Sequence, residues 1–226
     1  MPTRREMLGF MGATAAVLAL GCRGFAGAPP CIVRPEQMEG PYFVADRPAR
    51  ADIRAEPSDG SMQPGVPLEV TFRVHRIEGT SCLPLPGMVV DLWHCDAFGV
   101  YSGVRDPMFN TRDKRFLRGY QRTDGNGVAK FLTIYPGWYP GRTVHLHFKI
   151  RSRPPSWFGY DFTSQIYFDE SITDDVHQQA PYQSRGRRTV LNHQDGIFRR
   201  GGDRLMLPVA PAGDGYAGTF DIGLRI

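Results

Sequence analysis

Cysteine and histidine are scarce in this 226-residue sequence, which contains only four cysteines and six histidines. No two cysteines stand in the CxxC spacing of a zinc knuckle, so a structural zinc site of that kind is excluded. Beyond residue 28 no long apolar run with a 3.6-residue period is present, which argues against a helical fold. Internal repeats and low-complexity segments are also lacking, and the part after residue 35 is interpreted as one domain.

Positive charge is too sparse to indicate a nucleic-acid partner. The formal net charge is +4, and arginines 4, 5 and 23 against Glu6 place +2 of it in the first 28 residues. No dense lysine and arginine stripe interleaved with aromatic residues follows. The densest cluster contains arginines 185, 187, 188, 199 and 200, and it is interpreted as solvated surface.

The N-terminus has the pattern of a twin-arginine export signal. Arg4 and Arg5 are followed by an apolar run from Met7 to Leu20, which is too short for a typical membrane span. Residues 1–28 are therefore predicted to be the signal, with a candidate lipoprotein site at Cys22 and a rival cleavage site at 26–28. We expect a periplasmic or extracytoplasmic protein that meets the membrane only through a lipid anchor at Cys22, if Cys22 is lipidated.

An oxidising compartment permits one disulfide among the remaining cysteines. These are Cys31, Cys82 and Cys95, and the sequence does not decide which two of them pair.

Short strands dominate the rest of the chain. Residues 68–77 alternate between apolar and polar side chains, as in a half-buried strand, and further strands are predicted at 88–93, 128–134, 144–150, 164–168 and 218–224. With 26 glycines and 19 prolines in turns and loops, the pattern predicts an all-β, antiparallel β-sandwich with long irregular loops. The predicted single domain spans 29–226, with an extended arm at 31–59 and an irregular surface wrap at 169–200 that is expected to contain one helical turn.

His145 and His147 are the first candidate metal ligands. Residues two apart on a strand point the same way, so both imidazoles face one side, while Leu146 and Phe148 face the core. A His-x-His pair alone is more often only the polar face of a strand. Here it follows a proline- and glycine-rich loop that carries Tyr139, and no nearby carboxylate completes a ferrous facial triad.

A phenol ligand points to a strong Lewis acid. The unperturbed pKa of tyrosine is about 10, so its ionisation at neutral pH needs a highly charged cation beside it. Ferric iron is such a cation, and two phenolates with one hydroxide would balance its charge while neutral histidines complete the shell.

Five segments, in order, resemble the intradiol ring-cleavage dioxygenases. Residues 90–103 are similar to the first tyrosine motif of that family, Gly137-Trp138-Tyr139 to the second, and 142–148 to its arginine and paired histidines. Residues 39–43 resemble the N-terminal arm of the family, and 164–168 its glutamine strand. The resemblance covers residues 31–200.

The resemblance implies a ligand set and a reaction. Tyr101 and His145 would be the permanent in-plane ligands of Fe(III), and Tyr139 and His147 the axial pair. Tyr139 would leave the metal and help take the proton of the substrate, Arg142 would stabilise negative charge on the ring, and Gln165 would line the pocket. The implied reaction inserts O2 between the two hydroxyl-bearing carbons of a catechol and gives a muconate-type diacid.

The sequence departs from well-known members in two places. It lacks the helical N-terminal domain of the catechol and hydroxyquinol branch, and only five residues separate Tyr139 from His145. The substrate therefore stays open among protocatechuate, hydroxyquinol and larger catechols, and so does a homo-oligomeric state.

Two alternatives belong to other classes. A β-sandwich that only binds a sugar or a phenolic compound would have no reason to keep both tyrosines and both histidines. A zinc or copper enzyme could use His145 and His147 with a different metal.

Overall fold

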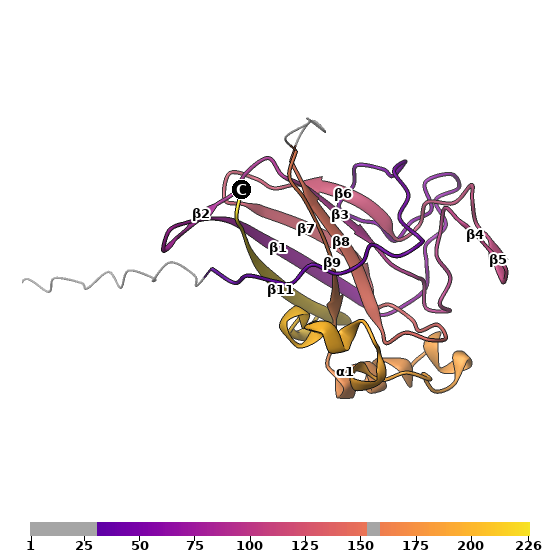
Figure 1. The fold of residues 1–226 in the computed structure, drawn as a ribbon. Coiled ribbons are helices and arrows are strands. Elements are labelled where there is room, and N and C mark those ends of the chain that lie inside the picture. The colour runs from indigo at the N-terminus through magenta and orange to yellow at the C-terminus, as the bar shows by residue number, and fades with distance from the viewer. Residues whose placement is uncertain (1–30, 153–158) are drawn as a thin grey trace, which may run out of the picture.

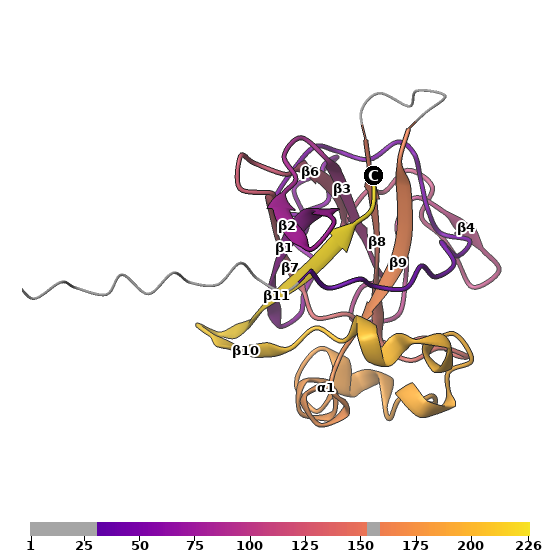
Figure 2. The same cartoon turned by 60° about the vertical axis from the view of Figure 1, so that its left-hand side comes forward.

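Two β-sheets face each other in the computed structural model, which describes residues 31–152 and 159–226. One sheet has the order β10-β11-β1-β2, with β7 also paired to β1, and the other has the order β6-β3-β8-β9. Figures 1 and 2 show the two layers from two sides, with the helical segments gathered at one end. The first sheet contains β1 (Pro67–Glu78), β2 (Ser81–Pro84), β7 (Val128–Ile134), β10 (Val209–Ala212) and β11 (Gly215–Leu224). The second contains β3 (Val89–Trp93), β6 (Arg118–Arg122), β8 (His145–Arg151) and β9 (Asp161–Tyr167), and β4 (Arg105–Asp106) forms a separate hairpin with β5 (Phe109–Asn110).

The predicted β-sandwich is confirmed, with one parallel pairing in it. β1 runs parallel to β11, from Leu68 opposite Tyr216 to Arg76 opposite Leu224, and the other strand pairs are antiparallel. Parallel neighbours need a long connection between them. Here nearly the whole domain provides that connection, because β1 is its first strand and β11 its last.

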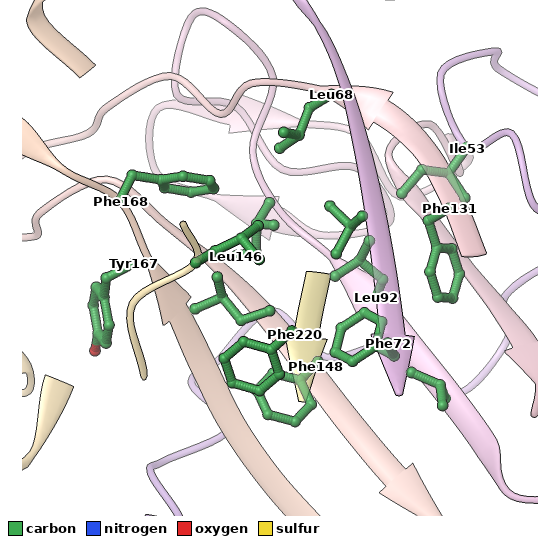
Figure 3. Packing of buried hydrophobic residues seen from close by; sticks show 14 of the residues in the cluster. Ile53, Leu68, Phe72, Leu92, Phe131, Leu146, Phe148, Tyr167, Phe168 and Phe220 are labelled. Carbon is green, nitrogen blue, oxygen red and sulfur yellow. The ribbon is translucent and has the colours of Figure 1, made fainter. Parts of the chain in front are cut away.

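The core lies between the two sheets. Phe72 of β1 packs against Phe148 of β8 and Phe220 of β11, and Figure 3 shows the three rings together. The ring centroids of Phe148 and Phe220 lie 5.4 and 5.9 Å from that of Phe72. Leu92 and Leu146 of the second sheet are also fully or nearly fully buried in this cluster. Apolar side chains at alternate positions thus fill the interface and fix which face of each strand points inward.

The sequence pattern missed the shorter strands. β6 was not predicted, because its residues Arg118-Gly119-Tyr120-Gln121-Arg122 show no apolar alternation. It is nevertheless held by pairing with β3, where Asp91 lies opposite Tyr120. β2 and β10 are four residues each and mostly exposed, so burial leaves little signal in their sequences.

The predicted extended arm lies over the sheets without regular secondary structure of its own. Its Ile53 is fully buried and donates its backbone N–H to the carbonyl of Leu132 in β7. A disulfide joins Cys31 at the start of the arm to Cys82 in β2, while Cys95 is a buried free thiol. The pairing that the sequence left open is therefore Cys31–Cys82.

The predicted wrap at 169–200 contains more helix than one turn. The helix α1 (Glu170–His177) begins after Asp169, whose carboxylate accepts a hydrogen bond from the Ser171 N–H as an N-cap. The 3₁₀ turns η1 (Tyr182–Arg185), η2 (Asn192–Gln194), η3 (Phe198–Arg200) and η4 (Gly202–Leu205) follow it. The one predicted helical turn falls short of α1 because only Thr173, Val176 and His177 of this polar helix are buried, which leaves little periodic signal in the sequence.

The predicted export signal at 1–28, with Cys22, lies outside the described residues. Among the residues that are described, no helix has the length and apolar character needed to span a bilayer.

Candidate active site

Strand β8 places both candidate histidines on one face, as predicted. His145 and His147 are each 2% exposed, while Leu146 and Phe148 between and after them are fully buried in the core on the other face. The ring of His147 stacks on that of Trp93 in β3, with centroids 5.1 Å apart and planes 10° apart. Two neighbouring strands thus fix the orientation of this imidazole.

Two loops bring the tyrosines to this face, and their backbones touch. Gly99 has φ +82°, and a Cβ there would lie 2.4 Å from the carbonyl oxygen of Trp138. A Cβ on Gly137 would lie 2.5 Å from the carbonyl oxygens of Asp96 and Ala97. The left-handed conformation at Gly99 and the close backbone approach at both positions require glycine, so these positions place the Tyr101 loop directly against the Tyr139 loop.

The four predicted metal ligands converge. The hydroxyl oxygen of Tyr139 lies 3.1 Å from Nε2 of His145, and that nitrogen lies 3.1 Å from Nε2 of His147. The ring of Tyr101 is 5.7 Å from that of Tyr139 and 6.1 Å from that of His147, between centroids. Its buried hydroxyl has no hydrogen-bond partner in the described residues.

Burial keeps the histidines neutral and the tyrosines protonated. Desolvation, followed by the charge of Arg142, lowers the pKa of His145 to about 3. Desolvation also lowers the pKa of His147 well below its ordinary value, with His145 as the next cause. Burial raises the pKa values of both Tyr101 and Tyr139, while the Arg142 cation opposes the rise at Tyr139. Neutral imidazole is the form that binds metals, whereas these phenols need a strong cation to ionise.

The hydrogen bonds of His145 aim one nitrogen at the cluster. Its Nδ1 lies 2.6 Å from the carbonyl oxygen of Thr143, which can only accept, so Nδ1 carries the proton. The lone pair of Nε2 therefore faces Tyr139 and His147. Such a second hydrogen bond commonly fixes the tautomer and direction of a metal-binding histidine.

Arg142 and Gln165 form a connected polar group beside the cluster. Nη2 of Arg142 donates to Oε1 of Gln165 at 2.6 Å, and Nη1 lies 3.4 Å from Nε2 of His145. Gln165, opposite His147 in the β8–β9 register, donates from Nε2 to the Met38 carbonyl oxygen in the arm at 3.0 Å. The guanidinium is thereby fixed next to Tyr139 and His145.

Sequence reasoning missed Asp195, which orients Arg142. Oδ2 of Asp195 accepts hydrogen bonds from Nε of Arg142 at 2.8 Å and from the backbone N–H of Thr143 at 2.9 Å. Its side chain is 1% exposed. Asp195 lies in the wrap, in a polar segment that carries no periodic signal, so only the tertiary structure places it here.

Other tyrosine and histidine side chains near the site point elsewhere. Tyr135, four residues before Tyr139, bonds through its hydroxyl to Thr173 in α1 at 2.7 Å. Both ring nitrogens of His94 are bonded, to the Cys95 carbonyl oxygen and to Oγ1 of Thr133. His177 bonds to the Pro136 carbonyl oxygen, and His193 is exposed.

The chemistry of the donor set fits ferric iron. Within the two described ranges, no group of three or more His, Cys, Asp or Glu side chains forms a metal site. The cluster instead offers two phenol oxygens and two neutral imidazole nitrogens, and the buried hydroxyl of Tyr101 has no protein partner. Hard phenolate oxygen with imidazole suits a trivalent iron better than a soft metal.

Comparison with known proteins decides the family. The family model described as "Dioxygenase" matches residues 38–197, which include all four clustered side chains. A solved structure titled as an intradiol ring-cleavage dioxygenase from Tetranychus urticae has 32% sequence identity, a TM-score of 0.73, and coverage of 86% of this chain and 95% of its own. The chain belongs to the intradiol ring-cleavage dioxygenase family.

Curated intradiol relatives match over a shorter part. The protocatechuate 3,4-dioxygenase beta chain of Burkholderia cepacia is 32% identical over 153 residues, which cover 63% of this chain and 58% of the relative. A chlorocatechol 1,2-dioxygenase of a Pseudomonas strain is 28% identical and is covered over 54% of its length. The chain thus spans little more than half the length of these intradiol relatives.

Proposed function

We propose that this protein is a non-haem Fe(III)-dependent intradiol dioxygenase that inserts both atoms of O2 between the two hydroxyl-bearing carbons of a catechol. The product is a muconate-type diacid. The observation that carries the proposal is that Nε2 of His145 lies 3.1 Å from both the hydroxyl oxygen of Tyr139 and Nε2 of His147, with the buried hydroxyl of Tyr101 beside them. Relatives named as catechol, chlorocatechol and protocatechuate dioxygenases support it.

The iron would be held by Tyr101, Tyr139, His145 and His147. When bound, ferric iron supplies the Lewis acidity that ionises phenols and draws electron density from a catechol, which opens the ring carbons to O2. The two histidines are neutral ligands. The phenolates of Tyr101 and Tyr139 would therefore supply all the negative charge among the side chains that hold the iron.

Tyr139 is proposed to accept a proton from the substrate. Its side chain is only half-buried, in contrast to the fully buried Tyr101, so it is the phenol that an incoming catechol reaches first. Its phenolate oxygen is the base, and the Arg142 charge beside it stabilises the ionised form before the proton arrives.

Arg142 is proposed to stabilise negative charge that develops on the ring. Asp195 and Gln165 hold its guanidinium on two sides, so the cation needs no rearrangement during the reaction. Gln165 also lines this side of the site and links it to the arm through the Met38 carbonyl oxygen.

We expect purified protein to contain one ferric ion per chain and to show a visible phenolate-to-iron charge-transfer band. With a panel of catechols, oxygen uptake should accompany a product spectrum of cleavage between the hydroxyls rather than beside them. Removing the iron with a chelator should remove both the band and the oxygen uptake, and ferric iron should restore them. Zinc or copper as the only metal that supports turnover would contradict the proposal and favour the alternative enzyme.

We also propose that the protein is exported by the twin-arginine route to the periplasm or another extracytoplasmic space. The Arg4-Arg5 pair and the apolar run to Leu20 support this, and the Cys31–Cys82 disulfide suits an oxidising compartment. A doubly substituted chain with Arg4→Lys and Arg5→Lys should remain in the cytoplasm when cells are fractionated. The unchanged chain should leave it, and retention of both chains would refute export.

A further inference from the structure

Arg118 of β6 is a buried cation that forms no ion pair with any carboxylate in the described part of the chain. It is 2% exposed, and the hydrogen bonds of its guanidinium all go to oxygens of Ser102 and Tyr42. Burying a charge costs free energy even when its hydrogen bonds are satisfied. A guanidinium at this position therefore needs an explanation beyond the packing of β6.

The guanidinium joins two segments that meet at the candidate iron site. Nε of Arg118 donates to the carbonyl oxygen of Ser102 at 3.1 Å and to its hydroxyl at 2.9 Å, and Ser102 directly follows Tyr101. Nη1 donates to the carbonyl oxygen of Tyr42 in the arm at 2.8 Å. A planar fork of donors can span both segments at once, which a lysine cannot do.

Tyr42 carries this connection to the ring of Tyr101. The two rings stack with centroids 4.5 Å apart and planes 28° apart. The hydroxyl of Tyr42 donates to Oδ2 of Asp106 at 2.6 Å, so both ends of Tyr42 are anchored. Gly40, two residues earlier, also approaches His147, since a Cβ there would lie 3.3 Å from Cε1 of that ring.

Tyr101 depends on these contacts for its orientation. Among the described residues, no hydrogen-bond partner outside the ligand cluster holds its buried hydroxyl, whose neighbour there is Tyr139. Its carbonyl oxygen accepts a hydrogen bond from Oγ1 of Thr111 at 2.5 Å, which fixes the backbone only. The stacked ring of Tyr42 and the loop around Ser102 therefore help to set the direction of the phenol, and Arg118 holds both.

We propose that Arg118 is a positioning residue for the phenol ligand Tyr101, acting through the backbone of Ser102 and the stacked ring of Tyr42. This inference rests on the proposed function, because it assigns Tyr101 to the iron. It predicts an effect on the metal site itself, and not only on the free energy of unfolding.

The test uses the full chain loaded with ferric iron, and it measures the charge-transfer band and the rate of iron release to excess EDTA. Arg118→Lys should shift or broaden the band and speed iron release by about tenfold or more, in line with losses of supporting contacts at other metal sites. Tyr42→Leu, which removes the stacked ring but leaves the guanidinium in place, should act in the same direction.

Arg34→Lys is the matched control. Arg34 lies in the arm, and its guanidinium likewise donates to backbone carbonyls, those of Asp221 and Arg204, and lies over the ring of Phe220. Because these contacts are not with Tyr101 or its loop, the Arg34→Lys variant should keep the wild-type band and release iron within about a factor of two of the wild-type rate.

The outcomes separate this inference from the proposed function. A folded Arg118→Lys with the wild-type band and release rate would overturn the positioning role. If Arg118→Lys does not fold by circular dichroism, Tyr42→Leu decides in the same way. If the unchanged chain takes up no ferric iron, the proposed function fails first and this inference falls with it.

Discussion

Replacing Tyr139 with phenylalanine is expected to lower kcat for ring cleavage by about 10²–10⁴-fold, the usual contribution of a positioned proton acceptor. The substitution removes only the hydroxyl that lies 3.1 Å from Nε2 of His145. Tyr101, His145 and His147 would remain to hold iron, so the metal content should change less than turnover does. Oxygen uptake at saturating catechol, with iron measured in the same sample, checks both expectations.

Tyr135→Phe is the control for this change. Tyr135 lies four residues earlier in the same loop, but its hydroxyl bonds to Thr173 in α1 and not to the cluster. Losing that buried hydrogen bond should lower the free energy of unfolding by about 1–3 kcal/mol without lowering kcat. A Tyr139→Phe variant with wild-type turnover would contradict the proposed role of the phenol. If the unchanged chain binds a catechol but does not turn it over, the protein would instead be a binding module.

Replacing Arg142 with methionine is expected to lower kcat by about 10²–10³-fold, as does the loss of a fixed donor near developing negative charge. The variant removes the cation next to Tyr139 and breaks the contacts with Asp195 and Gln165. Arg142→Lys should recover little of the lost kcat, because an ammonium group does not reproduce the separate directions in which the guanidinium donates to Asp195 and Gln165. Steady-state kinetics with the iron content held equal across variants provides the measurement.

Arg188→Met is the matched control for Arg142. Its side chain is also buried, at 5% exposure, and it forms ion pairs with Glu170 and Asp174 of α1 instead of contacts with the cluster. We expect this variant to be less stable to denaturant but to turn over normally once folded. Equal losses of kcat in Arg142→Met and Arg188→Met would show that general destabilisation, rather than the charge at the site, causes the effect.

The longer strands could be predicted because their buried side chains are apolar at alternate positions in the sequence. The prediction of 128–134 coincides with β7, and the alternation in 68–77 corresponds to β1, whose Val70 and Phe72 are fully buried. The sequence of β6 has no such alternation. This strand is held by backbone pairing with β3 and by hydrogen bonds from Arg118 to residues that are distant in sequence.

The candidate active site likewise has some features that the sequence predicts and others that depend on the fold. His145 and His147 share a strand, so their common direction follows from a two-residue spacing alone, and the tyrosines were found through motifs around them. The approach of the two tyrosine loops through Gly99 and Gly137 depends on contacts between segments that are distant in the chain. No local pattern encodes such a contact.

Strand periodicity and ligand chemistry are local properties, so the sheet-rich fold class and the set of phenol and imidazole side chains could be predicted from the amino-acid sequence. The Cys31–Cys82 pairing, the placement of Asp195 beside Arg142 and the stacking of the arm on Tyr101 emerge from the three-dimensional fold alone. Each of these joins residues about 50 or more positions apart, and such pairs are selected by how the whole core packs rather than by their neighbours in sequence.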